Sequence, residues 1–429
     1  MSYTVNRIFK LRTRTILAAA LIFLFLRYPL NFIHIEKLKQ KSDKIQIYDN
    51  LVQGSAPLCR TLNRIHYDIL LEQDGRYTKF HHKYKPSHQK RKSRRFKNPT
   101  GYADIQPVKH KYFFAMNLHN NQEVIPHLLQ ELLRVFEYLG PQNIYFSLYE
   151  NGSFDSSKYI LSMFKVTLDK LGIRNTVVLN KTTRPINTHR IEYLAKVRNK
   201  AIEPLETESL NGRKYDKIVF MNDVVFCRND ILELLYQSEH QQSDVTCPLD
   251  FDTGTSNNNT IYFRDTWVAR DLNGDSFEKS LNRIVSHKPS MERFRNNLPF
   301  QVQCCWNGAV VLNAKPFYEP INLKFRRSNI KQNECSASEC SLMCNDFWQN
   351  GFRRIVTVPR VLLTYQMKHF ELLDDRYKLD PIPSPKLEKI KYVDGPEKIK
   401  CKELVKLDTV EHGDSVVWVK YTKNGVKVY

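Results

Sequence analysis

Residues 217–226 combine the pattern of a buried strand with a carboxylate at Asp223. Residues 230–235 follow as a short amphipathic helix with an acidic first residue. A carboxylate at the carboxyl end of a strand stands where open α/β sheets bind ligands. Hard divalent cations prefer oxygen ligands, so an acid at this place can hold a metal against a diphosphate. The alternative that the segment leaves open is an aspartate that caps a turn.

The chain before Asp223 alternates between strand and helix patterns. We expect strands at 112–116, 143–149 and 176–179, and helices at 123–139, 157–172 and 191–205. Such a succession predicts right-handed crossovers and a mostly parallel central sheet, hence an α/β fold. After Asp244 the pattern becomes irregular and rich in aromatic residues and aspartate, which is typical of substrate loops over an α/β scaffold.

The basic charge of the chain is concentrated at its N-terminal end. The 429 residues carry a formal charge of +21, and residues 1–110 hold 22 Lys and Arg against 7 Asp and Glu, a net of +15. The remainder has a net charge of only +6. We therefore expect no nucleic-acid partner for the folded body.

Residues 15–26 form a continuous apolar run that follows four basic residues. A cleaved signal peptide and an uncleaved signal anchor both fit this pattern. The run is short for the about 20 residues of a membrane span. It reaches that length if it continues to residue 35 with Arg27 snorkelling to the interface. No small-residue cleavage site follows, so we favour the anchor, with residues 1–14 cytosolic and the body lumenal.

The rest of the chain divides into three expected parts. Residues 36–107 are polar and basic and predict a stem, 108–375 the folded body, and 376–429 a C-terminal extension with a final strand near 415–419. The basic run at 81–97 is typical of a solvated segment, although binding to acidic lipid or polysaccharide stays open. The sequence assigns no role to the extension.

Cysteines and glycosylation sequons agree with a lumenal body. Nine cysteines leave at least one unpaired within the chain. For the closely spaced Cys335, Cys340 and Cys344 we favour disulfide or buried thiol over zinc, because a fourth ligand is missing. Acceptor sequons begin at Asn151, Asn180 and Asn258. We expect Asn151 to be unmodified, because it follows an expected strand at the edge where a ligand would bind and a glycan there would block that ligand.

Several long segments resemble, in this order, the fungal α-1,3-mannosyltransferase family, which includes the cryptococcal capsule-associated proteins. They are 149–155, 190–205, 220–227 with 230–235, 250–252 with 263–277, 303–317, and 338–348 with 358–361. The resemblance runs from about residue 112 to about residue 370. It implies a GT-A-like fold, with residues 108–375 as the glycosyltransferase domain, and a single-pass type II protein of the Golgi membrane. It also implies GDP-mannose as donor, a mannose-containing glycan as acceptor, Mn²⁺ or another divalent cation, and retention of configuration.

The resemblance and the chemistry suggest donor-binding residues. Glu150 and Asp155 suit a ribose or a base, while Arg198 and Asn199 suit the diphosphate or the sugar, because an arginine fork binds phosphate oxygens bidentately. An ordinary helix-surface ion pair is the alternative for Arg198. Asn222 stands where the first acid of a DxD-type motif would be.

Two residues are the expected metal ligands. Asp223 is the first, and His369 could supply a second from a later loop. The amide at Asn222 gives this site less negative charge, which leaves metal dependence open. A surface or core histidine is the alternative interpretation of His369.

Acceptor binding and catalysis are expected in the segments after residue 244. Sugar hydroxyls suit carboxylates and aromatic faces, and a glycine allows close backbone approach. The expected acceptor or sugar ligands are Asp250, Asp252, Trp267, Trp306, Asn307 and Gly308, with core packing the alternative for Trp306. Glu339 and Asp265 are the expected catalytic carboxylates.

Three other interpretations remain open at this point. The same fold could use another nucleotide sugar such as UDP-xylose. The chain could instead be a non-catalytic protein of glycan assembly in the secretory pathway. This alternative stays open because Asn222 has an amide where a DxD-type motif has an acid. A membrane-anchored polyanion-binding protein that acts through 81–97 would make the folded body dispensable.

Overall fold

A computed structural model describes residues 56–83, 109–254, 260–377, 382–404 and 416–421. The expected cytosolic tail and signal anchor lie outside these ranges, as does the basic run from residue 84 onward. Within the described ranges, no helix has both the length and the apolar character needed to cross a membrane.

The centre of the fold is a nine-stranded sheet in the order β3-β2-β1-β4-β8-β5-β9-β7, with β6 paired to β5. Its strands are β1 Tyr112–Leu118, β2 Ile144–Glu150, β3 Arg174–Leu179, β4 Lys217–Met221, β5 Val245–Thr253, β6 Ile261–Phe263, β7 Phe300–Gln301, β8 Ala309–Asn313 and β9 Ile355–Thr364. The half from β3 to β4 is parallel, as predicted. The sheet as a whole is mixed, because β8 runs antiparallel to both β4 and β5, and β7 runs antiparallel to β9.

The strands that sequence patterns missed lie in the other half of the sheet, which contains both antiparallel pairs and the parallel pair β5–β9. β5 is buried over most of its length, yet it contains Pro248 and Asp250, which break an apolar run. Proline cannot donate to a strand ladder. The β5–β9 register shifts between Cys247 and Leu249, on either side of that proline. A strand built around such an irregularity has no simple period-2 pattern.

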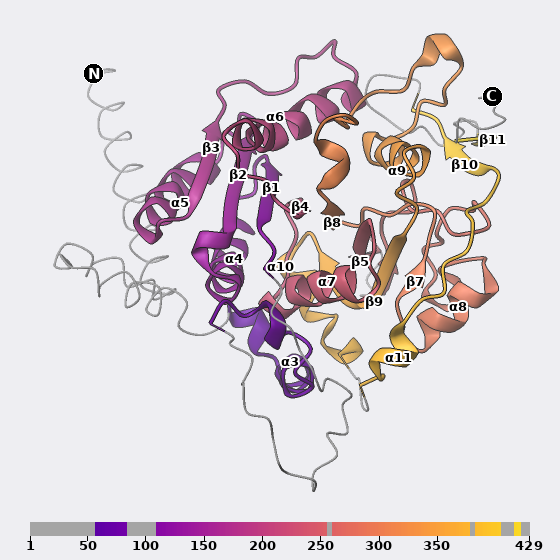
Figure 1. The fold of residues 1–429 in the computed structure, drawn as a ribbon, viewed down its shortest axis with the longest axis horizontal. Helices are drawn as coiled ribbons and strands as arrows, with labels where there is room; N and C mark the ends of the chain where they lie inside the picture. Colours follow the sequence, from indigo (N-terminus) through magenta and orange to yellow (C-terminus); the bar gives the residue numbers. More distant parts are fainter. Residues whose placement is uncertain (1–55, 84–108, 255–259, 378–381, 405–415, 422–429) are drawn as a thin grey trace, which may run out of the picture. The chain divides into compact units, whose positions relative to one another are not determined.

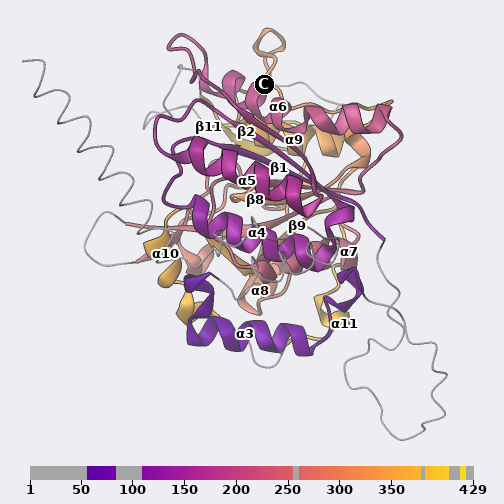
Figure 2. The same cartoon turned by 90° about the vertical axis from the view of Figure 1, so that its left-hand side faces the viewer.

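Helices cover both faces of the sheet. Figures 1 and 2 show α6 and α9 on one side, and α4, α5 and α7 on the other. The principal helices are α3 Leu62–Gln73, α4 Ile125–Leu139, α5 Ser157–Leu171, α6 Arg190–Leu210, α7 Arg228–His240, α8 Lys288–Arg295, α9 Glu339–Gln349, α10 Met367–Glu371 and α11 Pro385–Glu388. The three helices expected before Asp223 are confirmed as α4, α5 and α6, and the short helix after it as α7.

Residues 56–83, assigned to the stem on sequence patterns, pack on the body instead. α3 lies below α7 in Figure 1. Arg64 Nη1 pairs with Asp230 at 3.0 Å, and Arg76 Nη1 pairs with Glu233 at 3.1 Å, with both arginines fully buried. Apolar side chains of the segment, such as Leu71 and Phe80, are buried as well. The segment resembles a solvated stem in sequence because charged and polar residues are interspersed among these apolar ones.

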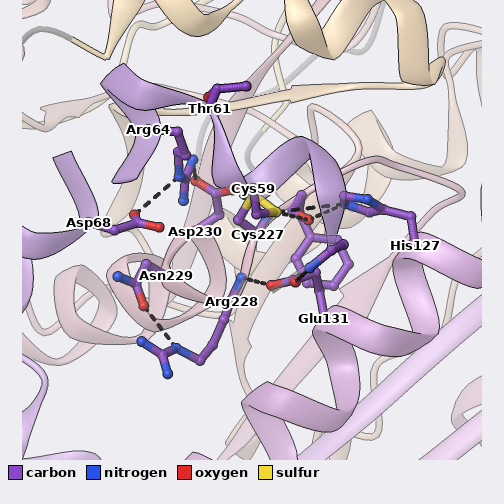
Figure 3. Close-up of a disulfide and its surroundings, with 12 residues drawn as sticks. Cys59, Thr61, Arg64, Asp68, His127, Glu131, Cys227, Arg228, Asn229 and Asp230 are labelled. Carbon is purple, nitrogen blue, oxygen red and sulfur yellow. Dashed lines mark hydrogen bonds and ion pairs between the residues drawn. A yellow bond between two sulfur atoms is a disulfide. The ribbon is translucent and has the colours of Figure 1, made fainter. Parts of the chain in front are cut away.

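Figure 3 shows how a disulfide joins this N-terminal segment to the chain between β4 and α7. Cys59 is bonded to Cys227, the residue that precedes α7. His127 Nε2 donates to the Phe226 carbonyl at 2.7 Å, and Arg228 N donates to Glu131 at 2.8 Å. The turn that carries Asn222 and Asp223 is therefore held firmly at its far end.

Three more disulfides and one buried thiol account for the remaining cysteines. The disulfides are Cys247–Cys305, Cys304–Cys344 and Cys335–Cys401, and Cys340 is the unpaired cysteine. This confirms disulfide and buried thiol for the closely spaced cysteines. The C-terminal extension forms a hairpin of β10 Ile399–Lys402 and β11 Val416–Val419, so the expected last strand is also confirmed.

Candidate active site

The carboxyl ends of β1 and β4 form the switch point of the parallel half of the sheet. From β1 the chain proceeds through β2 to β3 on one side, then returns through α6 to β4 on the other side of β1. Open α/β sheets bind ligands at such a point. Across it, Asn121 Nδ2 donates to Asp223 Oδ2 at 2.7 Å, and burial raises the pKa of Asp223. Asp223 thus stands where the sequence predicted a ligand-binding acid.

Arg198 on α6 joins three segments that were singled out separately in the sequence. Its Nε donates to Glu339 Oε1 at 2.9 Å, and its Nη1 donates to Asn222 Oδ1 at 3.3 Å. The guanidinium carbon lies 4.7 Å from the ring centre of Trp306 and 5.0 Å from that of Phe220. Arg198 is buried, so this is not the helix-surface ion pair that the sequence left open.

Asp250 and Asp265 form a pair of neighbouring carboxyl groups near Arg264. Asp250 is fully buried, and its Oδ1 accepts a hydrogen bond from Asp265 N at 3.3 Å. The carboxylate of Asp265 accepts from Val268 N at 3.2 Å and from Asn307 N at 3.3 Å. Burial, followed by repulsion from Asp265, raises the pKa of Asp250 to about 8. Burial also raises the pKa of Asp265, although its two main-chain donors favour the ionised form.

Arg264 and Tyr365 belong to the site, although the sequence did not single them out. The Arg264 guanidinium lies 3.9 Å from the centre of the Tyr365 ring, and its nitrogens approach Asp250 at 3.7 Å and Asp252 at 3.8 Å. Asn222 Nδ2 donates to the Tyr365 hydroxyl at 3.3 Å. The available signal was the position of Arg264, a cation directly before Asp265 in a family-like segment.

Residues 306–308 contact both Arg198 and Asn222. Trp306 is buried beside Arg198, and its indole Nε1 has no hydrogen-bond partner among the described residues. Asn307 Nδ2 donates to the Pro248 carbonyl at 2.7 Å. Gly308 has a φ of +84°, and its carbonyl accepts from Asn222 N at 2.9 Å. A Cβ at Gly308 would lie 2.6 Å from Val224 Cγ1. The groups that approach this glycine closely are Val224 and Tyr365 of the chain itself, and the approach of a sugar stays a prediction.

Four buried polar atoms near the ends of β1 and β2 have no hydrogen-bond partner among the described residues. They are Asn117 Oδ1, Glu150 Oε2, Asn151 Oδ1 and the Tyr193 hydroxyl. Buried polar groups are nearly always paired, so such a group of atoms indicates a ligand or water. Three of the four are acceptors, which suits the hydroxyls of a ribose and the N–H groups of a base.

These four atoms belong to one region. Asn117 Nδ2 donates to the Tyr149 carbonyl on β2 at 3.4 Å and to the Val197 carbonyl on α6 at 2.9 Å. Burial, followed by repulsion from Tyr149 and Glu150, raises the pKa of Tyr193. Asn117 and Tyr193 were not predicted from the sequence, because neither stands out in its strand or helix pattern.

Several predicted ligands have other contacts in the structure. Asp155 accepts hydrogen bonds from main-chain N–H groups beside the start of α5. Asn199 pairs with both main-chain groups of Phe325, at 2.8 and 2.9 Å. The Trp267 indole N–H donates to the Lys402 carbonyl at 3.0 Å, toward the C-terminal hairpin. Each of these three side chains therefore has a partner within the chain, and its role as a ligand of the donor or the sugar stays a prediction.

His369 and Asp252 form a pair of their own. His369 Nδ1 lies 3.0 Å from Asp252 Oδ1, and its Nε2 lies 2.9 Å from the Thr253 hydroxyl. Asp223 is not among the described contacts of His369. In the described residues, no group of three or more His, Cys, Asp and Glu side chains is arranged to hold a metal ion.

Comparison with known proteins gives the class and then the family. The chain is 32% identical over 320 residues to the alpha-1,3-mannosyltransferase CMT1 of Cryptococcus neoformans var. neoformans serotype D. The aligned residues cover 68% of this chain and 67% of that protein. Residues 111–346 match the family described as Cryptococcal mannosyltransferase 1. The protein is a glycosyltransferase. It belongs to the Cryptococcal mannosyltransferase 1 family, which confirms the resemblance found in the sequence.

Solved structures of other glycosyltransferases are more distant. The mannosyltransferase PcManGT from Pyrobaculum calidifontis, in complex with GDP-Man and Mn²⁺, has a TM-score of 0.37 and 11% identity, over 72% of this chain and 67% of that one. GalNAc-T7 with UDP, GalNAc and Mn²⁺ has a TM-score of 0.37 and 12% identity, over 59% of this chain. The match spans only 43% of GalNAc-T7. At this level of likeness, neither structure assigns a role to a residue of this chain.

Proposed function

We propose that this glycosyltransferase transfers mannose from GDP-mannose, in α-1,3 linkage and with retention of configuration, to a mannose-containing glycan. The observation that carries the donor sugar and the linkage is the 32% identity to a protein named as an α-1,3-mannosyltransferase. We further propose a type II Golgi membrane protein with a lumenal body. Four disulfides support an oxidising compartment.

The donor is proposed to lie along the edge from β2 to β4. The unpartnered oxygens at Asn117, Glu150 and Asn151 suit the nucleoside, with the Tyr193 hydroxyl beside them. The diphosphate then reaches the turn at Asn222, where two arginines stand. This placement matches the polar groups along the edge, because the oxygens that accept hydrogen bonds lie near β1 and β2, and the cations lie near Asn222.

The cations of the site support departure of the diphosphate. Arg198 is buried and aligned by Glu339, so its positive charge acts in a medium of low dielectric constant. The side chain of Arg264 is 44% exposed and can contact a bound donor directly. As the bond between the anomeric carbon and the diphosphate breaks, charges fixed in place stabilise the leaving group without reorganisation.

A divalent cation fits this site only together with the donor. Asp223 is a half-buried carboxylate at the edge, and Asn222 offers an amide oxygen that is already engaged by Arg198. Cations such as Mg²⁺ are often held by one or two carboxylates plus substrate phosphates. Asp223 would hold the ion, and the bound ion would neutralise charge on the diphosphate.

The carboxyl pair is proposed to face the acceptor. In this proposal Asp250 keeps a proton near neutral pH, whereas the carboxylate of Asp265 is the better hydrogen-bond acceptor. An ionised carboxylate can accept the hydrogen bond of the attacking hydroxyl and so orient its oxygen toward the anomeric carbon. This assigns different roles to two acids whose side chains share one environment.

The test is transfer by residues 56–429, expressed as a secreted domain. The protein is incubated with GDP-mannose, Mn²⁺ and α-linked mannobiose, with UDP-xylose as a parallel donor. We expect mannose transfer by the wild type and its loss in Asp223→Ala. Asp216→Ala is the matched control, because Asp216 precedes β4 at the opposite edge of the sheet. A folded wild type that uses UDP-xylose but not GDP-mannose would overturn the proposed donor.

A further inference from the structure

A cavity of about 210 Å³ lies between α9 and the C-terminal hairpin. Figure 1 shows β10 and β11 beside α9, and the disulfide Cys335–Cys401 fixes the hairpin to the segment that precedes this helix. The cavity is smaller than the roughly 300–1,000 Å³ of pockets for drug-sized ligands, so its size suits a single ring. None of the residues that we place at the Asn222–Asp223 turn lines it.

Gln303 gives the cavity an unused hydrogen-bond acceptor. The residue is fully buried and lines the cavity. Its side-chain Nε2 donates to Asn345 Oδ1 at 3.0 Å, which holds the side chain in place. Its main-chain carbonyl accepts from the Trp348 indole at 2.8 Å, which holds the backbone. Its Oε1 has no partner among the described residues. A hydroxyl group of a ligand would satisfy this oxygen.

The walls of the cavity carry an excess of positive charge. Four cations line it, namely Arg270, Lys400, Lys402 and Lys420, against the single carboxylate of Glu334. Glu334 is already engaged by two nitrogens of Arg326, at 2.7 and 2.8 Å. In the part of the chain that the structure describes, Lys402 has no carboxylate partner. Lys400 pairs with Asp275 at 2.6 Å and Lys420 pairs with Glu397 at 3.0 Å, so the excess of positive charge rests on Lys402 and Arg270. Cations in excess of carboxylates favour an anionic ligand.

Arg270 adds to this excess because main-chain carbonyls, rather than acids, accept its hydrogen bonds. It is 4% exposed and donates to the carbonyls of Ala269, at 2.8 Å, and of Lys400. Burial lowers the pKa of Arg270 to about 10, and repulsion from Arg270 and Lys400 adds to the burial that lowers the pKa of Lys402. An anion in the cavity would relieve this repulsion.

Aromatic side chains complete the lining and link the cavity to the acceptor side. Trp267 and Tyr421 both line it. Trp267 stands two residues after Asp265, whose carboxylate accepts from Asn307 N in the candidate active site. A ring held against Trp267 would therefore contact the same segment that carries Asp265. Trp267, predicted as a sugar ligand from the sequence, lies here and not at the Asn222–Asp223 turn.

We propose that this cavity binds one anionic sugar unit, an acid sugar or a sugar phosphate, of the acceptor glycan. The inference rests on the proposed function, because it treats the acceptor as a glycan. Gln303 Oε1 accepts from a sugar hydroxyl, Lys402 and Arg270 face the carboxylate or phosphate, and Trp267 lies against the ring. The bound sugar unit anchors the glycan beside the Asp265 segment while another sugar of the same glycan accepts the mannose.

Calorimetry without donor tests the proposal on residues 56–429. The probes are a hexuronic acid, mannose 6-phosphate, neutral mannose and inorganic phosphate. Variants are Lys402→Ala, whose side chain is half-buried, and Gln303→Leu, with Lys391→Ala as control because Lys391 is exposed and lines no part of the cavity. Loss of a charged partner should weaken binding about tenfold or more.

We expect one of the two anionic sugars to bind, neutral mannose to bind at least about tenfold more weakly, and Lys402→Ala to lose the difference while Lys391→Ala keeps it. The two anionic probes distinguish carboxylate from phosphate. Equal binding of neutral and anionic sugars would overturn the proposal, and so would inorganic phosphate that binds as tightly as the sugars. Because no donor is present, failed mannose transfer with intact binding counts against the proposed function alone.

Discussion

Arg198 Nε donates to Glu339 Oε1 at 2.9 Å, and this ion pair joins two helices whose residues are 141 positions apart. Both side chains are almost completely buried. A buried ion pair is costly to break from one side, because the remaining charge stays without a partner. Glu339, expected in the sequence as a catalytic carboxylate, thus has an evident task in orienting Arg198 toward Asn222.

A set of three variants separates stability from catalysis at this pair. Glu339→Gln and Arg198→Met should each lose about 3–5 kcal/mol in the free energy of unfolding, because one charge is left buried alone. The double variant Arg198→Met with Glu339→Met should recover part of that loss. Its transfer activity should still be lower by on the order of 10²-fold or more, since the cation is gone. Chemical denaturation and kcat/KM measure the two effects.

The outcome against this interpretation is a double variant that regains activity together with stability. Arg198 would then be a structural residue of α6. Lys200→Met is a suitable control, because Lys200 lies on α6 and pairs with Glu203 near the surface.

Asp250 should make the stability of the protein depend on pH. Its folded-state pKa is raised to about 8 from the ordinary value near 4, so folding favours its protonated form. The associated stability is present at low pH and is lost as the pH rises from about 4 through about 8. Asp250→Asn keeps the shape without the ionisation, so its free energy of unfolding should fall less over this range. Denaturation at pH 5, 6.5 and 8 measures this.

Asp394→Asn is the control for that series, because Asp394 is exposed in the C-terminal extension. Curves for the wild type and Asp250→Asn that run parallel from pH 5 to pH 8 would show that Asp250 is ionised in the folded protein.

The N-terminal segment should be required for donor binding as well as for stability. Replacing Cys59 and Cys227 by serine should cost about 2–5 kcal/mol, because the disulfide closes a long loop. Donor KM should rise too, since Cys227 bounds the turn that carries Asn222 and Asp223. The matched control replaces Cys335 and Cys401, a disulfide at the other end of the fold. That control should lose stability with donor KM unchanged.

A truncated protein that begins at residue 105 tests the same segment more severely. It leaves Asp230 and Glu233 buried without Arg64 and Arg76. We expect poor folding, seen as low secretion and early protease cleavage relative to residues 56–429. Equal stability of the two proteins would show that residues 56–83 are a dispensable stem.

The parallel half of the sheet was predictable because its strands and helices carry clean periodic patterns. Residues 112–221 form the expected alternation, and Asp223 lies at the expected edge. What the sequence could not supply is the partner of each polar side chain. Arg264 and Tyr365 lie 101 positions apart, and only the packing of β5 beside β9 brings them together. The N-terminal segment was missed for a different reason, since buried ion pairs and a disulfide, which sequence patterns do not reveal, contribute to its attachment.

Gly308 should be intolerant of any side chain. Its φ of +84° is rare for other residues, and a Cβ would lie 2.6 Å from Val224 Cγ1 and 3.3 Å from the Tyr365 hydroxyl. Both neighbours adjoin the Asn222–Asp223 turn, whose Asn222 N donates to the Gly308 carbonyl. Gly308→Ala should therefore cost at least about 1–2 kcal/mol from backbone strain alone. It should also lower kcat/KM by displacing the turn. Gly351→Ala shares the positive φ but has open space around its Cβ, so it reports strain without displacement. If both variants lose stability and neither loses activity, the contact at Gly308 does not position the turn.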